Sequence, residues 1–277
     1  YGDNSEAVWG VAWQGSHVFV GGTNTGLHVV DASDPRAPVV VAHLTIAELG
    51  GVSAGPVFAI GNLLVVTTPK NHAGVATVDI SAPDAPALLD FVRPETESYI
   101  GGFYGRHAYL VSPLRAYDVT SDPSAIELVG TTETAESEYL SFADGRLFLG
   151  LLRPDPGIVR FDLSDPAHPR RIDKIEGRRD FFGGTFTDDQ FSMPIGNLLV
   201  VSDDEVDIGS VIAVQETARD ADPPEVLHVR PADGGTNLPT TSRVGIAFSD
   251  HLDVRTLDVS TFAVRPVDGE PLTGRFG

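Results

Sequence analysis

A short pattern of turn glycine, apolar strand and aspartate-containing turn recurs five times along this sequence. The glycines that mark the copies stand at positions 15, 61, 105, 145 and 196, so the successive steps are 46, 44, 40 and 51 residues. Within each copy, apolar residues alternate with polar ones or run in fours, which predicts strands rather than amphipathic helices. A period of this length with four strand-sized segments is typical of a β-propeller blade. The sequence therefore predicts an all-β fold with at least five four-stranded blades in one toroid.

Each segment of the repeat has a predicted place in its blade. Segments 8–13, 56–60 and 139–142 precede the glycines and are predicted to be the innermost strands, beside the axis. The glycine makes a tight turn into the second strand. The third strand ends at an aspartate that can accept backbone N–H groups in the next turn, and a proline step opens the outermost strand. The aspartates are Asp31, Asp79, Asp118 and Asp162, and Gln215 takes this place in the fifth copy.

The repeat resembles the LVIVD repeat family, a group of bacterial and archaeal surface β-propellers. The first copy reads Gly-Leu-His-Val-Val-Asp-Ala-Ser-Asp-Pro from Gly26 to Pro35, and four of the five copies carry the Asp-x-Ser/Thr signature. The resemblance covers residues 7–216 or so. It implies an exported scaffold at the cell surface and names no activity.

A second pattern follows a polar, proline-rich linker at residues 219–224. Two strand-like segments, 225–230 and 242–249, flank the turn sequence Pro-Ala-Asp-Gly-Gly-Thr-Asn-Leu-Pro. This resembles bacterial Ig-like domains of the S-layer-protein type. Such sandwiches usually need about 100 residues, so 225–277 is predicted to be a truncated Ig-like β-sandwich. The propeller is predicted to span 1–218, with blades at about 7–44, 52–92, 99–131, 138–176 and 181–216.

Charge and composition exclude or disfavour several classes of binding partner and several kinds of site. The net charge is −20, which disfavours nucleic acids and anionic membrane surfaces because both require Lys and Arg to neutralise phosphates. The chain has no cysteine, which excludes disulfides, thiolate nucleophiles and Cys-ligated zinc. No apolar run reaches the roughly 18 residues of a spanning helix. We expect a fragment of an extracellular or cell-surface protein whose signal peptide lies outside these 277 residues.

Candidate binding residues are predicted at the strand starts and loops that could surround the mouth of the central channel. The longest insertion, around residues 178–189, mixes arginine, aromatic and acidic residues, as binding loops often do. The alternative for each such segment is an ordinary exposed loop. The candidates are Trp9, His72, Glu138, Tyr139, Arg179, Asp188 and Asp189.

One acidic loop is a candidate metal site. Closely spaced carboxylates can hold Ca²⁺, which takes six to eight oxygen ligands, and the loop carries Asp203, Asp204 and Asp207. It lacks the glycine of an EF-hand loop, so a solvated acidic loop is the alternative. No cofactor is predicted, and calcium is the one cation this loop could hold. The histidines form no spacing typical of a metal site.

The sequence favours a non-catalytic binding module. No phosphate-binding glycine loop is present, so we predict a scaffold whose loops or channel mouth bind a glycan, a peptide or a surface protein. The alternative is a metal-assisted hydrolase or lyase with its site in the central channel, which would leave little local sequence signal. A purely structural envelope component is a third hypothesis.

Overall fold

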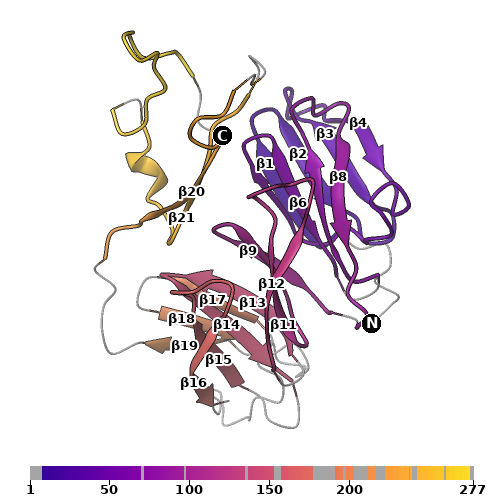
Figure 1. Ribbon diagram of the computed structural model, residues 1–277, viewed down its shortest axis with the longest axis vertical. Coiled ribbons are helices and arrows are strands. Elements are labelled where there is room, and N and C mark those ends of the chain that lie inside the picture. Colours follow the sequence, from indigo (N-terminus) through magenta and orange to yellow (C-terminus); the bar gives the residue numbers. More distant parts are fainter. Residues whose placement is uncertain are drawn as a thin grey trace.

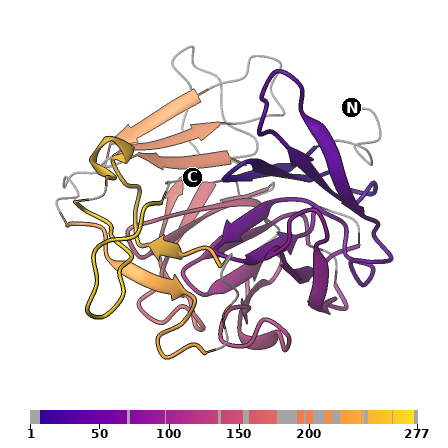
Figure 2. The ribbon, with the colours of Figure 1, turned by 90° about the horizontal axis from the view of Figure 1, so that it is seen from above.

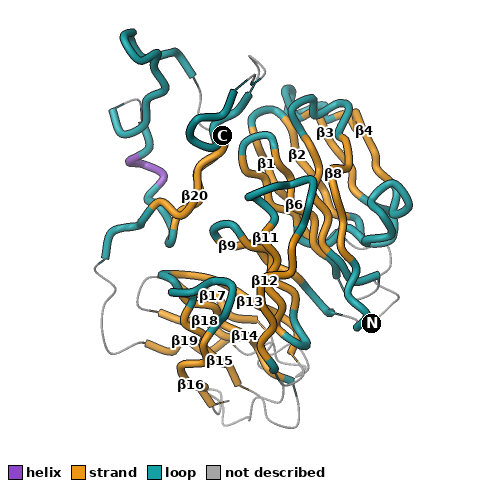
Figure 3. Tube along the Cα trace, viewed as in Figure 1, coloured by secondary structure: helices purple, strands orange, loops and turns teal. Residues whose placement is uncertain are grey.

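The computed structural model describes residues 8–69, 72–96, 98–134, 137–152, 157–176, 191–195, 198–202, 211–215, 222–236, 238, 242–258 and 260–274. In this part of the chain, the strands form six separate antiparallel sheets in sequence order (Figure 1). The rest consists of loops and one short 3₁₀-helix, η2 (Val254–Thr256) (Figure 3). No described helix is long and apolar enough to span a membrane.

The first five sheets are the blades of a propeller, and neighbouring strands within each are joined by antiparallel pairing. Blade 1 contains β1 (Gly10–Gln14), β2 (His17–Gly21), β3 (Leu27–Asp31) and β4 (Val39–Leu44). Blade 2 contains β5 (Val57–Ile60), β6 (Leu63–Thr67), β7 (Val75–Asp79) and β8 (Ala87–Val92). Blade 3 contains β9 (Gly101–Tyr104), β10 (His107–Leu110), β11 (Leu114–Asp118) and β12 (Glu127–Thr132).

The fourth blade repeats this order, and the described part of the fifth blade has three strands. Blade 4 contains β13 (Ser137–Ala143), β14 (Arg146–Leu151), β15 (Gly157–Asp162) and β16 (Arg170–Glu176). Blade 5 contains β17 (Phe191–Ile195), β18 (Leu198–Ser202) and β19 (Val211–Gln215). A two-stranded sheet, β20 (Val226–Arg230) and β21 (Gly245–Phe248), follows the propeller.

The blades pack radially, as the repeat predicts. Viewed from above, they follow one another around a ring (Figure 2). The first strands of the blades contact one another, β1 with β5, β9 with β13 and β13 with β17, so they are the innermost strands. The hydrophobic cores lie between successive blades: one cluster joins Phe19 and Val29 of blade 1 to Leu64 and Val78 of blade 2. Further clusters lie between blades 2 and 3, 3 and 4, and 4 and 5.

The four repeated aspartates form turns, which confirms their predicted structural role. The carboxylates of Asp31, Asp79 and Asp162 each accept the backbone N–H two residues later at 2.8 Å, and that of Asp118 accepts the N–H of Thr120 at 3.0 Å. Backbone hydrogen bonds from Ser33 and Ser164 hold the pKa values of Asp31 and Asp162 below their ordinary value. Each aspartate ends the third strand of a different blade, and its carboxylate is used in the turn of that blade.

The β20–β21 hairpin packs on the propeller face that carries the turns between the first and second strands of the blades, which we name the turn face. A Cβ on Gly245 would lie 2.3 Å from the backbone N of Gly61, so the two backbones are in direct contact. The Arg243 N–H donates to Asn62 Oδ1 at 3.2 Å, and the Arg230 guanidinium donates to the Thr120 carbonyl at 3.0 Å.

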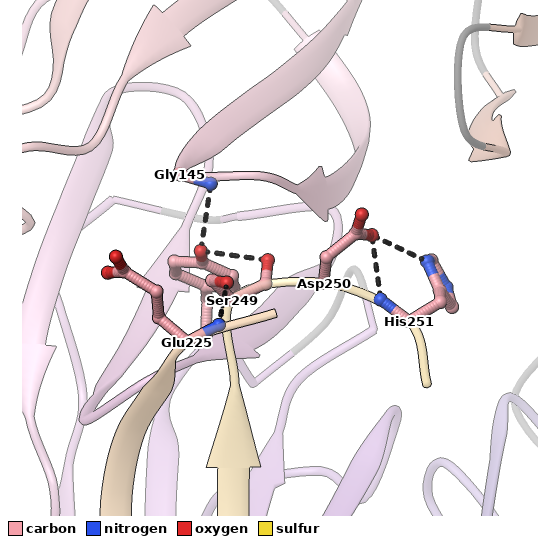
Figure 4. A network of polar contacts seen from close by, with 6 residues as sticks. Gly145, Glu225, Ser249, Asp250 and His251 are labelled. Carbon is pink, nitrogen blue, oxygen red and sulfur yellow. Dashed lines mark hydrogen bonds and ion pairs between the residues drawn. The ribbon is translucent and has the colours of Figure 1, made fainter. Parts of the chain in front are cut away.

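A tyrosine and a serine complete this joint. The Tyr104 hydroxyl donates to the Ser249 carbonyl at 3.1 Å and accepts the Gly145 N–H at 2.9 Å. The Ser249 hydroxyl in turn accepts the Glu225 N–H at 2.8 Å (Figure 4). Leu227 of β20 packs against the core between blades 3 and 4. Apolar packing and backbone hydrogen bonds therefore both attach the hairpin to the propeller.

Candidate functional site

Aromatic side chains stand where the innermost strands begin, on the face opposite the turn face; we name it the aromatic face. Trp9 precedes β1, Tyr99 precedes β9, Tyr139 lies near the start of β13, and Phe191 begins β17. They come from blades 1, 3, 4 and 5. Trp9, Tyr99 and Tyr139 precede the turn glycines Gly15, Gly105 and Gly145 by the same interval. The repeat itself therefore brings three of these rings to one level near the axis.

Contacts between neighbouring blades hold these strand starts. Pro69, in the loop after β6, forms an isolated β-bridge with Ile100, next to Tyr99. The Ser137 N–H donates to the Ser112 hydroxyl at 3.1 Å, and that hydroxyl donates back to the Ser137 carbonyl at 3.0 Å. Blade 2 thus places Tyr99, and blade 3 places the segment that leads to Tyr139.

The four rings form one contiguous cluster, which we name the aromatic cluster. The centroids of Trp9 and Tyr99 are 5.8 Å apart, and those of Tyr99 and Tyr139 are 5.5 Å apart, both edge to face. The Trp9 and Tyr139 rings are nearly parallel at 6.3 Å, and Phe191 stacks on Tyr139 at 3.7 Å. The two edge-to-face pairs have the geometry that aromatic quadrupoles favour. The cluster is therefore preorganised without a ligand.

The cluster is only partly covered. Tyr139 is buried at its centre, Trp9 and Tyr99 are half-buried, and Phe191 is exposed. Glu138, half-buried beside Tyr139 at an irregularity of β13, is the nearest acidic residue along the chain. A preformed apolar surface with a neighbouring polar group is the usual composition of a ligand site. This surface can pack against a flat or C–H-rich face of a ligand.

The structure unites two of the predicted site residues and leaves others elsewhere. Trp9 and Tyr139 meet in the aromatic cluster. His72 is exposed in the loop between β6 and β7, and no described contact joins its imidazole to the cluster. Among the described residues, no group of three His, Cys, Asp or Glu side chains could hold a metal. Arg179, Asp188 and Asp189, and the candidate calcium ligands Asp203, Asp204 and Asp207, lie outside the described residues.

Tyr99 and Phe191 are the two members of the aromatic cluster that sequence reasoning missed. A signal for Tyr99 was present, because it stands at the same distance from its turn glycine as Trp9 and Tyr139. Phe191 is offset by one residue from that position. In blade 2 the equivalent position is Gly55, where a Cβ would lie 2.5 Å from Pro69. Blade 2 therefore adds no ring, and the cluster is asymmetric around the axis.

Comparison with protein families finds one match in each of the two parts of the chain. Residues 7–45 match the LVIVD repeat, and residues 220–276 match the bacterial Ig-like domain. The LVIVD match covers the strands of blade 1. Both resemblances predicted from the sequence are confirmed at these residues. None of the curated proteins compared with the chain matches it.

Solved structures confirm the β-propeller fold of the part that carries the LVIVD repeat. The periplasmic gluconolactonase PpgL of Pseudomonas aeruginosa matches with a TM-score of 0.56 at 15% identity, over 74% of this chain and 69% of that one. The β-propeller domain of Cps50 (Swd1) from Myceliophteria thermophila matches with a TM-score of 0.54 at 11% identity, over 74% of this chain and 67% of that one. At these identities the likeness establishes the fold and no activity.

Proposed function

We propose that this protein is a non-catalytic binding module and that the aromatic cluster is its ligand site, with a glycan as the ligand. The observation that carries the proposal is the convergence of Trp9, Tyr99, Tyr139 and Phe191 from four different blades into one partly exposed surface. A core has no need to leave such a surface open, whereas a binding site does.

The chemistry of the surface favours a neutral sugar among the ligand classes. A sugar ring presents one face of C–H groups, weakly positive, which packs on the negative face of an aromatic ring. Glu138, next to Tyr139 in the sequence, carries a carboxylate that can accept hydrogen bonds from hydroxyl groups. The net charge of −20 opposes polyanions.

The two family matches favour a location that suits such a role. LVIVD repeats and bacterial Ig-like domains are typical of surface or secreted bacterial proteins. We propose that the protein acts outside the cell, where glycans are abundant, and that the Ig-like module attached to the turn face leaves the aromatic face turned outward.

The chain offers its own matched control for a binding test. It contains two tryptophans, Trp9 in the cluster and Trp13 on an exposed side of blade 1. A glycan array would identify a binder, and titration of the Trp13→Phe variant would report through Trp9 fluorescence alone. Trp9→Ala and Phe191→Ala should each weaken binding about ten-fold or more, because truncating an aromatic anchor costs at least roughly 1.4 kcal/mol. Trp13→Ala should bind as the unmodified chain does.

Three results would count against the proposal. Binding that survives Trp9→Ala and Phe191→Ala would place the site elsewhere. Binding that is lost in Trp13→Ala would move it to the exposed side of blade 1. A screen in which only peptides bind would keep the site and replace the ligand class.

The alternative of a metal-assisted hydrolase or lyase has no support among the described residues. The likeness to a gluconolactonase extends to the fold alone, and the described part of the chain contains no three-residue metal group. Incubating any identified glycan with the protein, with and without added Ca²⁺ or Zn²⁺, tests this alternative directly. Product formation that Glu138→Gln abolishes would favour the enzyme.

A further inference from the structure

Among the described elements, no blade packs against one side of blade 1. Strand neighbours point to opposite faces, and Ala12 of β1 packs toward blade 2, so Val11 and Trp13 point the other way. These two side chains are 59% and 68% exposed. Val18, Val20 and Val30, which share this side in the paired strands β2 and β3, are only half-buried. Blade 1 therefore presents an apolar sheet face to solvent.

Blade 5 has a matching open side. Leu199 and Val201 of β18 pack toward blade 4, and Pro194 pairs with Leu199, so Met193 and Ile195 of β17 point away from blade 4. Met193 is 60% exposed and Ile195 is 53% exposed. Leu198, the partner of Ile195 in the sheet, is exposed as well. The two apolar faces thus belong to the first and the last blade.

The interior blades show what normally covers such faces. In blade 2, every residue of β6 is buried, because residues of one parity pack on blade 1 and those of the other parity pack on blade 3. In β1 and β17 only one parity is covered, and exposure alternates along the strand. In Figure 2, blades 1 and 5 flank the same sector of the ring, and no described strand lies between them. The exposed faces of blades 1 and 5 are therefore of the same kind as the faces that neighbouring blades cover in blade 2.

We propose that these two faces form one docking site and that its occupant is a further blade of the same repeat, carried by the same polypeptide. The occupant must be an antiparallel sheet with apolar residues on both sides, since it has to cover both faces at once. In the described part of the chain, no sheet of a second copy has two free apolar sides, because blades 2, 3 and 4 are covered on both sides and blades 1 and 5 each have a single free side. A further blade closes the toroid.

Cysteine reporters test the proposal, because the chain has no cysteine of its own. Val11→Cys and Met193→Cys place single thiols on the two faces, and Val267→Cys, at a fully exposed position in the C-terminal module, is the control. The maleimide labelling rate is measured in the 277-residue chain and in a chain extended by a copy of residues 52–98 ahead of Val8. In the extended chain, labelling of both face reporters should fall at least ten-fold while the control keeps its rate. Unchanged labelling of either face in a folded extended chain would overturn the proposal.

A second measurement uses the unextended chain and does not depend on the folding of a fusion. Packed sheets lie about 10 Å apart, so a sector that accepts one blade separates the two faces by about 20 Å. In the Val11→Cys/Met193→Cys variant, a cross-linker of that length should join the thiols within one molecule, and oxidation should give no disulfide. Ready disulfide formation would show that the faces meet and leave no room for a blade. Concentration-dependent protection of both reporters would identify a second copy as the occupant and would also refute the proposal.

Discussion

Two glycines of this propeller are required for different physical reasons. Gly130, in the outermost strand of blade 3, has φ in the ordinary range, but a Cβ there would lie 1.6 Å from the carbonyl oxygen of Ala167 in blade 4. Gly145, in the turn between β13 and β14, has open space around its Cβ position but a φ of +64°. The first glycine permits two blades to approach, and the second permits a tight turn.

We predict that Gly130→Ala destabilises the protein more than Gly145→Ala does. The added methyl at 130 meets backbone, which cannot rotate away, so the free energy of unfolding should fall by about 3 kcal/mol or more. At 145 only the left-handed backbone conformation is penalised, which costs about 1 kcal/mol. Urea unfolding of both variants followed by circular dichroism measures the two losses. An equal or larger loss for Gly145→Ala would show that blades 3 and 4 separate more easily than their contact suggests.

At the scale of elements, the sequence predicted the features that depend on residues close together in the chain. The turn glycines and the aspartates after the third strands gave the blade order, because each acts within a few residues of itself. The aromatic cluster depends instead on four strand starts that are far apart in sequence, so it could be predicted only in part, from Trp9 and Tyr139. The contact of Gly61 with Gly245 has no local signal, and nothing in the sequence placed β20 and β21 on the turn face.

The joint between β10 and β20 contains two histidines that resist protonation. Burial lowers the pKa of His107 below its ordinary value of 6.5, and Arg106 adds to this effect, whereas Asp118 and Asp165 oppose it. Burial also lowers the pKa of His228, together with Arg106 and Arg230, against Asp118. The buried atoms His107 Nδ1 and His228 Nε2 have no hydrogen-bond partner among the described residues. Protonation of either ring is therefore less favourable in the folded protein than in the unfolded chain.

We predict that stability falls as the pH drops below 6.5. The unfolded chain then binds protons that the folded protein excludes, so protonation favours unfolding. Well above pH 6.5 both states are neutral and the effect vanishes. Melting temperatures between pH 7.5 and about 5.5 avoid the range in which most carboxylates titrate. The His107→Gln/His228→Gln variant should flatten the curve, while His168→Gln, at an exposed turn, should not. An unchanged slope in the double variant would assign the pH dependence to other groups.

At the scale of the whole molecule, the described part of the Ig-like region is attached to one face of the propeller. The hairpin of the Ig-like region covers the turn face, whereas the aromatic face carries the proposed ligand site. Leu227 packs into the core between blades 3 and 4, and Ala247 packs into the core between blades 2 and 3. The hairpin is therefore part of the propeller's hydrophobic cores and not a separate unit on a tether.

We predict from this packing that the hairpin and the propeller unfold together. Leu227→Asp removes apolar packing and introduces a charge at the edge of a core, so it should lower the melting temperature of the single main transition by about 5 °C or more. Val267→Asp, at a fully exposed position of the C-terminal module, should leave it unchanged. Scanning calorimetry of the three chains decides the matter, because an independent hairpin would give two transitions, and Leu227→Asp would then shift only the smaller one. The joint between the two parts would in that case transmit no stability to the blades, and the fixed orientation of the aromatic face would lose its physical basis.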